Sequence, residues 1–446
     1  MRTARCLTLL VATVVPSLAR AQASPPPGDI DPELARIIAT TPAIDNHAHP
    51  VLPPPNLATD RGFDALPVDH MEPQTDPAAW RPDSLQLADA WKALWHFTEA
   101  PPLSAEAMKR LDASRGKVRA QQGEHYDQWV LDQAHIATML ANRVALGPGL
   151  EAPRFRWVPY VDALVFPLDN AGLAAATPDR TQFFALEDKL RAQYLQAVHL
   201  PAPPATLEAY LAQVVTPTLE RQHDQGAVAA KFEIAYLRGL DFTDPTREEA
   251  ARIYARGVKQ PHPDPAEYKI LQDFLFRFIA TECGRLKMAV HLHAMSGGGG
   301  YFSIAGANPL LLEPLFNAPR LRATQFVMLH GGWPFVHEAG ALLQKPNAWL
   351  DPSQQSLTIP PRTLAGWLRE WLEVFPDKVL FATDGYPFSD ALGWEEATFI
   401  ANRNLRQALG IALTGMLRDH EITRAQATAI ARGVLHDNAA KLYGLP

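Results

Sequence analysis

Cysteine is scarce in this sequence, because Cys6 and Cys283 are the only two among 446 residues. Cys6 falls in an N-terminal segment that we predict to be removed, which leaves Cys283 alone. A single cysteine cannot form an internal disulfide, so a disulfide scaffold is excluded and the fold must depend on its hydrophobic core. With 47% hydrophobic and 20% charged residues, the chain has the composition of a globular protein that can form a large core.

Long hydrophobic runs are missing beyond the N-terminus, so the rest of the sequence predicts no transmembrane helix. The N-terminus itself combines Arg2 and Arg5 with the apolar run 6–18 and small residues at 19–23. This order predicts a signal peptide over residues 1–23 and a secreted or periplasmic protein with no stable membrane insertion after cleavage. An uncleaved membrane anchor is the alternative.

An excess of positive charge is also absent, because 41 Lys and Arg stand against 48 Asp and Glu, a net charge of −7. Residues 1–23 hold Arg2, Arg5, Arg20 and no acid, so the mature chain would carry −10 (−7 minus 3). Such a chain does not attract nucleic acid, and a small molecule is the expected partner. The glycine run 297–300 has no Gly-Lys-Ser/Thr continuation, so it is not a phosphate-binding loop.

Short apolar runs alternate with longer amphipathic segments along most of the chain. This alternation predicts parallel strands joined by crossover helices. With polar residues at several strand ends it favours a (β/α)₈ TIM barrel over residues 24–446, with a helical insertion at about 51–133 after the first strand. A doubly wound open sheet is the alternative. The predicted strands cover 41–45, Ile136–Leu140, Trp157–Phe166, Ala227–Tyr236, Met288–His293, Gln325–His330, Ala348–Asp351 and Val379–Asp384.

Histidine or aspartate stands at the end of four of these strands. His47 and His49 follow the first strand two residues apart, and strand alternation turns both side chains to one side. The run 288–293 ends in a second such pair, His291 and His293, while the two later runs end in His330 and Asp384. Because active sites of barrels lie at the C-terminal ends of the strands, these side chains predict a metal site.

The same segments resemble the amidohydrolase superfamily, and more closely its amidohydrolase-related group with the FluG-like metal-dependent hydrolases. The resemblance rests on an ordered set that spans nearly the whole chain after residue 23. Its members are Ile44–His49, Lys231, Tyr236, Gly239-Leu240, His293, His330–Pro334, Thr383–Gly385 and Asn438–Tyr443.

The resemblance implies a metal held by His47, His49, a histidine of the run 288–293 and Asp384, with His330 near the substrate. It also implies that Lys231 lies at the position where many relatives carry a carboxylated lysine that bridges two metals. A buried ion pair of Lys231 with Glu233 is the alternative. His293 matches the usual ligand by position, although His291 is a second candidate on the same strand.

One further departure concerns an arginine that FluG-like sequences carry directly after the tyrosine matched by Tyr236. Here Leu237 intervenes and the arginine is Arg238, which puts in doubt any substrate contact implied for that arginine.

These features predict an amidohydrolase-type enzyme that cleaves a C–N or C–O bond of a small substrate with metal-activated water. Asp384 would hold the metal and accept the water's proton, His330 would bind the carbonyl oxygen or share the proton transfer, and Lys231 would bridge metals or stabilise negative charge. The metal is one or two divalent ions, with zinc as the default and manganese or iron as alternatives. A decarboxylase or other lyase on the same ligands and a non-catalytic exported metal- or ligand-binding barrel are the rival hypotheses.

Overall fold

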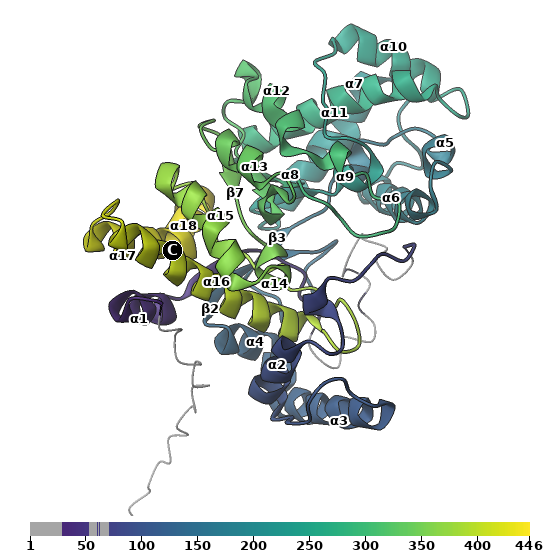
Figure 1. Cartoon of the computed structure of the whole chain (residues 1–446). Helices are drawn as coiled ribbons and strands as arrows, with labels where there is room; N and C mark the ends of the chain where they lie inside the picture. The colour runs from purple at the N-terminus through teal and green to yellow at the C-terminus, as the bar shows by residue number, and fades with distance from the viewer. Residues whose placement is uncertain (1–28, 53–59, 61, 63–70) are drawn as a thin grey trace, which may run out of the picture.

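The computed structural model describes residues 29–52, 60, 62 and 71–446 (Figure 1). The predicted signal peptide, residues 1–23, lies outside the described residues, as does part of the predicted insertion. Parallel strands form two ladders in the described part, β1-β2-β3 and β4-β5-β6-β7. The strands are β1 Ala43–Ala48, β2 Ile136–Asn142, β3 Phe155–Val158, β4 Ala229–Phe232, β5 Ala289–His293, β6 Phe326–Leu329 and β7 Ala348–Leu350.

Backbone hydrogen bonds join the two ladders into a closed ring. On one side, the N–H of Val228 donates to the carbonyl of Trp157 at 3.0 Å, which links β3 to β4. On the other side, segment 379–385 completes the ring. Its Leu380 N–H donates to Leu350 of β7 at 2.9 Å, and its Phe381 carbonyl accepts from Asn46 of β1 at 2.9 Å. The predicted (β/α)₈ barrel is confirmed, and segment 379–385 takes the place of its eighth strand.

The barrel interior holds one apolar layer, to which the seven strands and segment 379–385 all contribute. The layer comprises Ile44, Leu140, Val158, Ala229, Ala289, Val327, Leu329, Trp349, Leu380 and, from the helix after the barrel, Ala439. All are buried. Because side chains in a strand alternate between its two faces, the inward positions fill the barrel with side chains and leave its C-terminal rim for polar groups.

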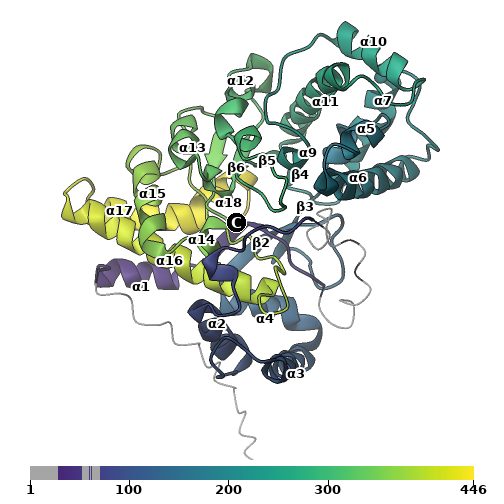
Figure 2. The ribbon, with the colours of Figure 1, turned by 45° about the vertical axis from the view of Figure 1, so that its right-hand side comes forward.

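Helices surround the ring, as Figure 2 shows for α11, α13, α15 and α16. Several begin at a capping residue followed by proline, the combination that favours helix initiation. Asp31, Thr177 and Asp264 cap α1, α6 and α11 in this way. The longer helices are α1 Pro32–Thr40, α6 Pro178–Ala197, α8 Thr216–Asp224, α10 Arg247–Gly257, α11 Pro265–Leu286, α13 Val336–Leu342, α15 Pro361–Val374, α16 Trp394–Arg418, α17 Arg424–Arg432 and α18 Asn438–Tyr443.

The predicted insertion after β1 is helical in its described part. It contains α2 Leu85–Trp95, α3 Ala105–Gln122 and α4 Tyr126–Gln133, which lie together below α16 in Figure 1. Shorter helices interrupt the other connections, namely α5 Ala171–Ala174, α7 Leu207–Tyr210, α9 Ile234–Leu237, α12 Glu313–Phe316 and α14 Gln355–Thr358. Within the described residues, we find no helix with the length and hydropathy needed to cross a bilayer.

Two predicted strands are too long. The predicted strand 157–166 ends at Val158, and a short 3₁₀ turn occupies Asp162–Leu164. The predicted strand 227–236 ends at Phe232, and α9 follows at once. Both apolar runs continue because their residues stay buried after leaving the ring. A continuous apolar run does not distinguish a strand from a buried turn or short helix.

Candidate metal centre

His47 and His49 lie at the C-terminal end of β1 and turn to the same side, as predicted. Their Nε2 atoms are 3.3 Å apart, and both side chains are buried. The pairing register of β1 with β2 shifts between Asp45 and Ala48, so this end of the strand is irregular. The Nδ1 atom of His49 lies 3.1 Å from the Tyr160 hydroxyl, which orients the ring and directs Nε2 toward His47.

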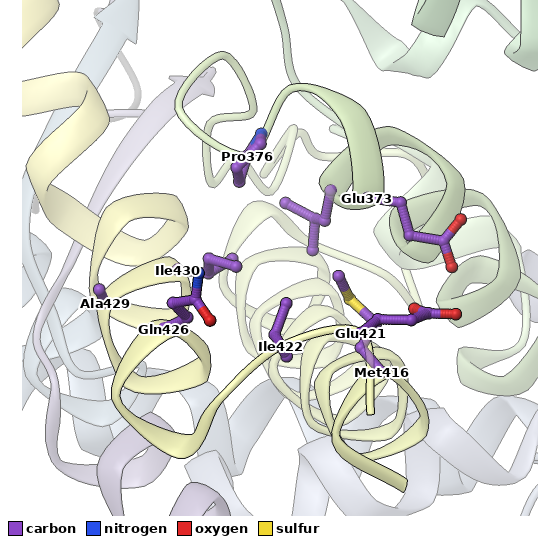
Figure 3. Close-up of a pocket in the computed structure, with 9 residues that line it drawn as sticks. Glu373, Pro376, Met416, Glu421, Ile422, Gln426, Ala429 and Ile430 are labelled. Atoms are coloured by element: carbon purple, nitrogen blue, oxygen red, sulfur yellow. The ribbon is translucent and has the colours of Figure 1, made fainter. Parts of the chain in front are cut away.

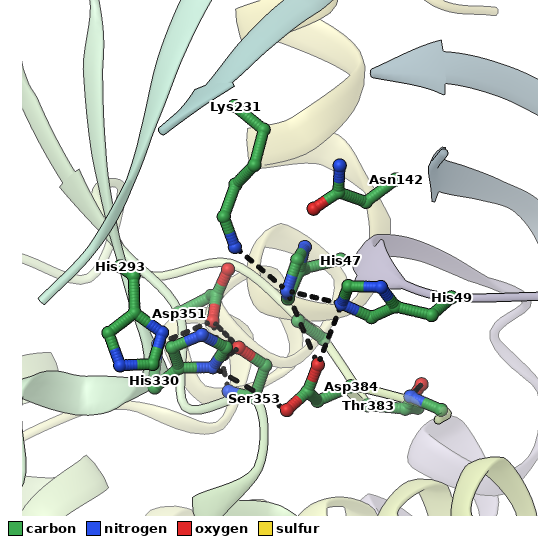
Figure 4. Close-up of polar contacts among 12 residues, drawn as sticks. His47, His49, Asn142, Lys231, His293, His330, Asp351, Ser353, Thr383 and Asp384 are labelled. Atoms are coloured by element: carbon green, nitrogen blue, oxygen red, sulfur yellow. Dashed lines mark hydrogen bonds and ion pairs between the residues drawn. The ribbon is translucent and has the colours of Figure 1, made fainter. Parts of the chain in front are cut away.

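Asp384 completes a three-ligand cluster with these histidines (Figure 4). Its Oδ1 atom lies 3.3 Å from Nε2 of His47 and 3.5 Å from Nε2 of His49. Ligands held about 2.1 Å from one ion in tetrahedral directions are about 3.4 Å apart. Two imidazole nitrogens and a carboxylate oxygen also suit zinc or another transition metal. The residues therefore fit one divalent ion by both spacing and donor chemistry.

The backbone at this cluster is strained. Asp384 has φ 57° and His330 has φ 70°, a left-handed conformation that non-glycine residues rarely adopt. Asp45 holds the first of these turns, because its carboxylate accepts hydrogen bonds from the Thr383 N–H at 3.0 Å and the Thr383 hydroxyl at 2.6 Å. Strain of this kind costs about 1–3 kcal/mol per residue and concentrates at functional sites.

His330 lies beside the cluster at the end of β6. Its Nδ1 atom is 3.8 Å from Oδ2 of Asp384, whereas His47 and His49 lie closest to the other oxygen, Oδ1. The His47 and His330 rings meet edge to face with centroids 5.1 Å apart. Asp384 thus places one oxygen among the ligands and the other near an imidazole, so that a proton acceptor and a titratable ring lie side by side at the site.

Burial and neighbouring charges determine the protonation of these groups. Burial lowers the pKa of His47 well below its usual value, and the nearby Lys231 lowers it further. Burial also lowers the pKa of His330. Burial alone would raise the pKa of Asp384, but His330, His47 and His49 outweigh it and hold the pKa well below its usual value. Neutral imidazoles beside an ionised carboxylate are the forms that bind a cation.

Lys231 of β4 enters the site from the opposite wall. Its Nζ atom is 3.4 Å from Nε2 of His47 and 2.7 Å from Oε1 of Glu233, and both charged side chains are buried. The ion pair with Glu233 that sequence analysis gave as the alternative is therefore present.

The two histidines of β5 have different surroundings. His293 lies on the site side, with its ring centroid 4.7 Å from that of His330 and its Nδ1 atom 3.6 Å from Oε2 of Glu233. His291 lies deeper, where its Nε2 atom is 2.7 Å from the Tyr443 hydroxyl. Neither joins the compact group of His47, His49 and Asp384 in the described structure.

Arg238 does not face the site. Its Nη1 atom lies 2.6 Å from Oδ1 of Asp273, and its other guanidinium nitrogens donate to the carbonyls of Gly239 and Asp241. The arginine displaced by one position is thus held by local partners.

Sequence reasoning assigned no role to several buried polar residues around the site. Asp351 directly follows β7 and accepts hydrogen bonds from the N–H groups of His330 and Ser353. Asn46, between the ligand histidine and Asp45, donates to Asp351 at 2.5 Å. Asp351 could have been found from the sequence, because it is an acid at the end of a predicted strand, as Asp384 is.

A surface cavity of about 550 Å³ opens elsewhere, between α15, α16 and α17 (Figure 3). Its two carboxylates, Glu373 and Glu421, both pair with Arg369. It therefore offers no converging ligand atoms like those at the barrel rim. Its lining comprises Leu372, Glu373, Pro376, Met416, Glu421, Ile422, Gln426, Ala429 and Ile430.

Comparison with known proteins identifies relatives of this site and fold. Protein fluG of Emericella nidulans is 27% identical over 305 residues, which cover 64% of this chain and 34% of that protein. The chain therefore spans about a third of the length of this relative.

Solved structures with little sequence identity share the fold. A uronate isomerase of Thermotoga maritima matches with a TM-score of 0.60 at 13% identity, over 93% of this chain and 98% of that one. A protein of Lactobacillus casei assigned as a metal-dependent hydrolase matches with a TM-score of 0.55 at 18% identity, over 92% and 97%. A sequence model described as amidohydrolase matches residues 186–445, more than half of the chain. This barrel with its His-His-Asp cluster is therefore a member of the amidohydrolase family.

Proposed function

We propose that this protein is a metal-dependent hydrolase that cleaves a C–N or C–O bond of a small molecule. The position of Asp384 carries the proposal, because one carboxylate oxygen lies among the ligand nitrogens and the other lies 3.8 Å from His330. A binding protein needs only the first contact. The second keeps Oδ2 away from the ligand nitrogens and beside an imidazole, where it can accept the proton that hydrolysis removes from water.

Each group at the site has a role that follows from its chemistry. A bound divalent ion would supply a Lewis acid that polarises a carbonyl group and acidifies water. Asp384 is ionised and can accept a proton at Oδ2. The neighbouring neutral His330 can take a proton at Nε2, because its Nδ1 atom faces the Ser353 hydroxyl at 2.8 Å. The aromatic side chains of Tyr386 and Tyr236 pack against two histidines of the site, with ring centroids 5.2 Å from His49 and 4.7 Å from His293.

The ion pair of Lys231 supports a centre with one metal. A carbamate on Lys231 would lie beside the buried Glu233 carboxylate, which is 2.7 Å from Nζ, and two anions in contact are unfavourable. We expect Lys231 to stabilise negative charge that develops on the substrate. Zinc remains the default ion, with manganese and iron as alternatives.

The test combines elemental analysis with product analysis. The zinc-loaded protein is assayed against a panel of amides, esters and lactones, and aromatic carboxylates are assayed in parallel for carbon dioxide release. An amine or alcohol product, with kcat reduced on the order of 10²–10⁴-fold by Asp384→Asn, supports the proposal. Carbon dioxide release would make the protein a lyase. Metal binding with no turnover of any panel member would favour a binding protein.

We also propose that the protein is exported, because basic, apolar and small-residue segments follow one another in residues 1–23. Expression of the full chain followed by N-terminal sequencing of the periplasmic fraction tests this. A new N-terminus near residue 24 is expected, and an intact Met1 in the membrane fraction would contradict it.

A further inference from the structure

A chain of hydrogen bonds crosses the barrel from α18 to His330. The Tyr443 hydroxyl contacts both His291 Nε2, at 2.7 Å, and Asn46 Oδ1. The Asn46 amide nitrogen reaches Asp351 Oδ2 at 2.5 Å. Ser353 Oγ lies 2.5 Å from Asp351 Oδ1 and 2.8 Å from His330 Nδ1. His291, Asn46, Asp351, Ser353 and His330 are all buried.

The proton positions in the first half of this chain follow from the donors available. Asn46 must direct its NH₂ group to the Asp351 carboxylate, because its carbonyl oxygen would repel that group. Its Oδ1 atom therefore faces Tyr443 and can only accept. Tyr443 has one hydroxyl proton and donates it to Asn46. His291 must then carry its proton on Nε2 and donate it to the Tyr443 oxygen.

The second half follows in the same way. Asp351 accepts hydrogen bonds from Asn46, from the Ser353 hydroxyl and from the N–H groups of His330 and Ser353. Burial raises the pKa of Asp351 above its usual value, and the four donors oppose that shift and favour the carboxylate form. The Ser353 hydroxyl has one proton and donates it to Asp351. Its oxygen must therefore accept a hydrogen bond from His330 Nδ1. A neutral His330 then carries its proton on Nδ1 and has a lone pair on Nε2.

We propose that Tyr443 is a positioning residue which, through Asn46, Asp351 and Ser353, fixes His330 as the Nδ1–H tautomer. His330 then offers the Nε2 lone pair to the site and accepts a proton there, and as a neutral ring it does not donate to a carbonyl oxygen from Nε2. This tautomer decides between the two roles that the sequence left open for His330. Its consequence for turnover rests on the proposed hydrolase function, whereas the tautomer itself does not.

The tautomer can be measured without a substrate. Two-bond ¹H–¹⁵N correlation spectra of protein labelled with [¹⁵N]histidine distinguish Nδ1–H from Nε2–H rings, and His330→Gln assigns the signal. The spectra are recorded metal-free and with zinc alone. In the unsubstituted protein His330 is expected as Nδ1–H. Tyr443→Phe keeps the aromatic ring and removes the hydroxyl, and it is expected to lower the Nδ1–H to Nε2–H ratio on the order of fivefold.

Ser353→Ala removes the last link and is expected to lower the ratio at least as far, while Tyr301→Phe, on an exposed loop tyrosine, leaves it unchanged. An Nε2–H ring in the unsubstituted protein would overturn the proposal even if Tyr443→Phe does not fold. A ratio that responds to Ser353→Ala but not to Tyr443→Phe would also overturn it. Failure to find hydrolysis leaves these spectra unaffected, so the two proposals fail separately.

Discussion

Two groups of buried charge in this molecule are built in opposite ways. In the first, which we name the rim cluster, the ligand atoms of His47, His49 and Asp384 converge within 4.8 Å. In the second, the insertion cluster, each buried carboxylate of α16 meets an arginine of α3. Arg115 Nη2 lies 2.6 Å from Glu396, and Arg119 Nη2 lies 2.9 Å from Glu395.

The difference shows how to separate a binding centre from a structural ion pair. In the insertion cluster the cation is part of the chain, so the charges are neutralised on folding and the insertion is held against α16. At the rim cluster the Lys231 ammonium lies 3.4 Å from His47 but is paired with Glu233, so it does not neutralise Asp384, and the backbone at Asp384 is in a strained conformation. Convergent acceptors on a strained turn indicate a site that needs an ion from outside.

The largest expected effect is loss of metal from the rim cluster. His47→Ala with His49→Ala removes two of the three ligands. Loss of one outer-shell partner already weakens metal binding about 10–100-fold, so this variant should lose more than 100-fold in affinity. Elemental analysis after dialysis should give about one equivalent for the unsubstituted protein and none for the variant. His337→Ala, on a side chain that is 72% exposed, is the control. Equal metal in both variants would contradict the assignment.

The insertion cluster should affect stability but not metal. Glu396→Leu removes the buried carboxylate partner of Arg115, which keeps an ion pair only with the exposed Asp112, and also the acceptor of the Trp95 Nε1–H. The variant is expected to lose about 3–5 kcal/mol of unfolding free energy. Arg115→Met combined with Glu396→Leu should recover part of that loss, since no buried charge remains, although the Trp95 N–H still lacks its acceptor. Denaturant titration measures both values, and the folded fraction of each variant should keep its metal. An insertion-cluster variant that folds but binds no metal would contradict the assignment of a purely structural role to that cluster.

Backbone strain at the rim can be tested at Gly332, two residues after His330. Gly332 has φ 71°, and an added Cβ atom would lie 2.6 Å from Cβ of Ala339. Gly332→Ala is therefore expected to cost about 2 kcal/mol or more, from the left-handed conformation and the contact together. Gly444 has φ 64° and open space, so Gly444→Ala should cost about 1 kcal/mol, the conformational part alone. If denaturant titrations show equal losses of unfolding free energy for the two variants, the close contact between the new Cβ atom and Ala339 adds nothing to the loss.

The smallest effect concerns Cys283, which is buried but belongs to neither cluster. Burial, together with the nearby Glu282 carboxylate, raises the pKa of its thiol to about 12. At pH 8 the thiol is protonated and covered, so it should not react with a disulfide reagent in the folded protein. In denaturant one thiol per chain should react if residues 1–23 are removed, and two if they remain. Rapid reaction of the folded protein would contradict the burial of Cys283.

Much of this protein could be predicted from the sequence. The alternation of apolar runs and amphipathic segments predicts the barrel, because a strand that ends in the ring and a helix that covers it need different spacings of apolar residues. His47, His49, His330 and Asp384 could be predicted as neighbours for a topological reason, since parallel strands present their C-terminal ends at one rim.

Other features were decided only by tertiary structure. The sequence places Tyr443 397 residues from Asn46, and only the packing of α18 against the barrel brings their side chains together. Which of His291 and His293 lies nearer the metal site depends likewise on the depth of each side chain within the barrel. Their two-residue spacing in the sequence does not predict that depth. Residues that share a strand end can be predicted from the chain because local geometry fixes their direction. Contacts across the barrel depend on how distant elements pack, and no local pattern in the sequence encodes them.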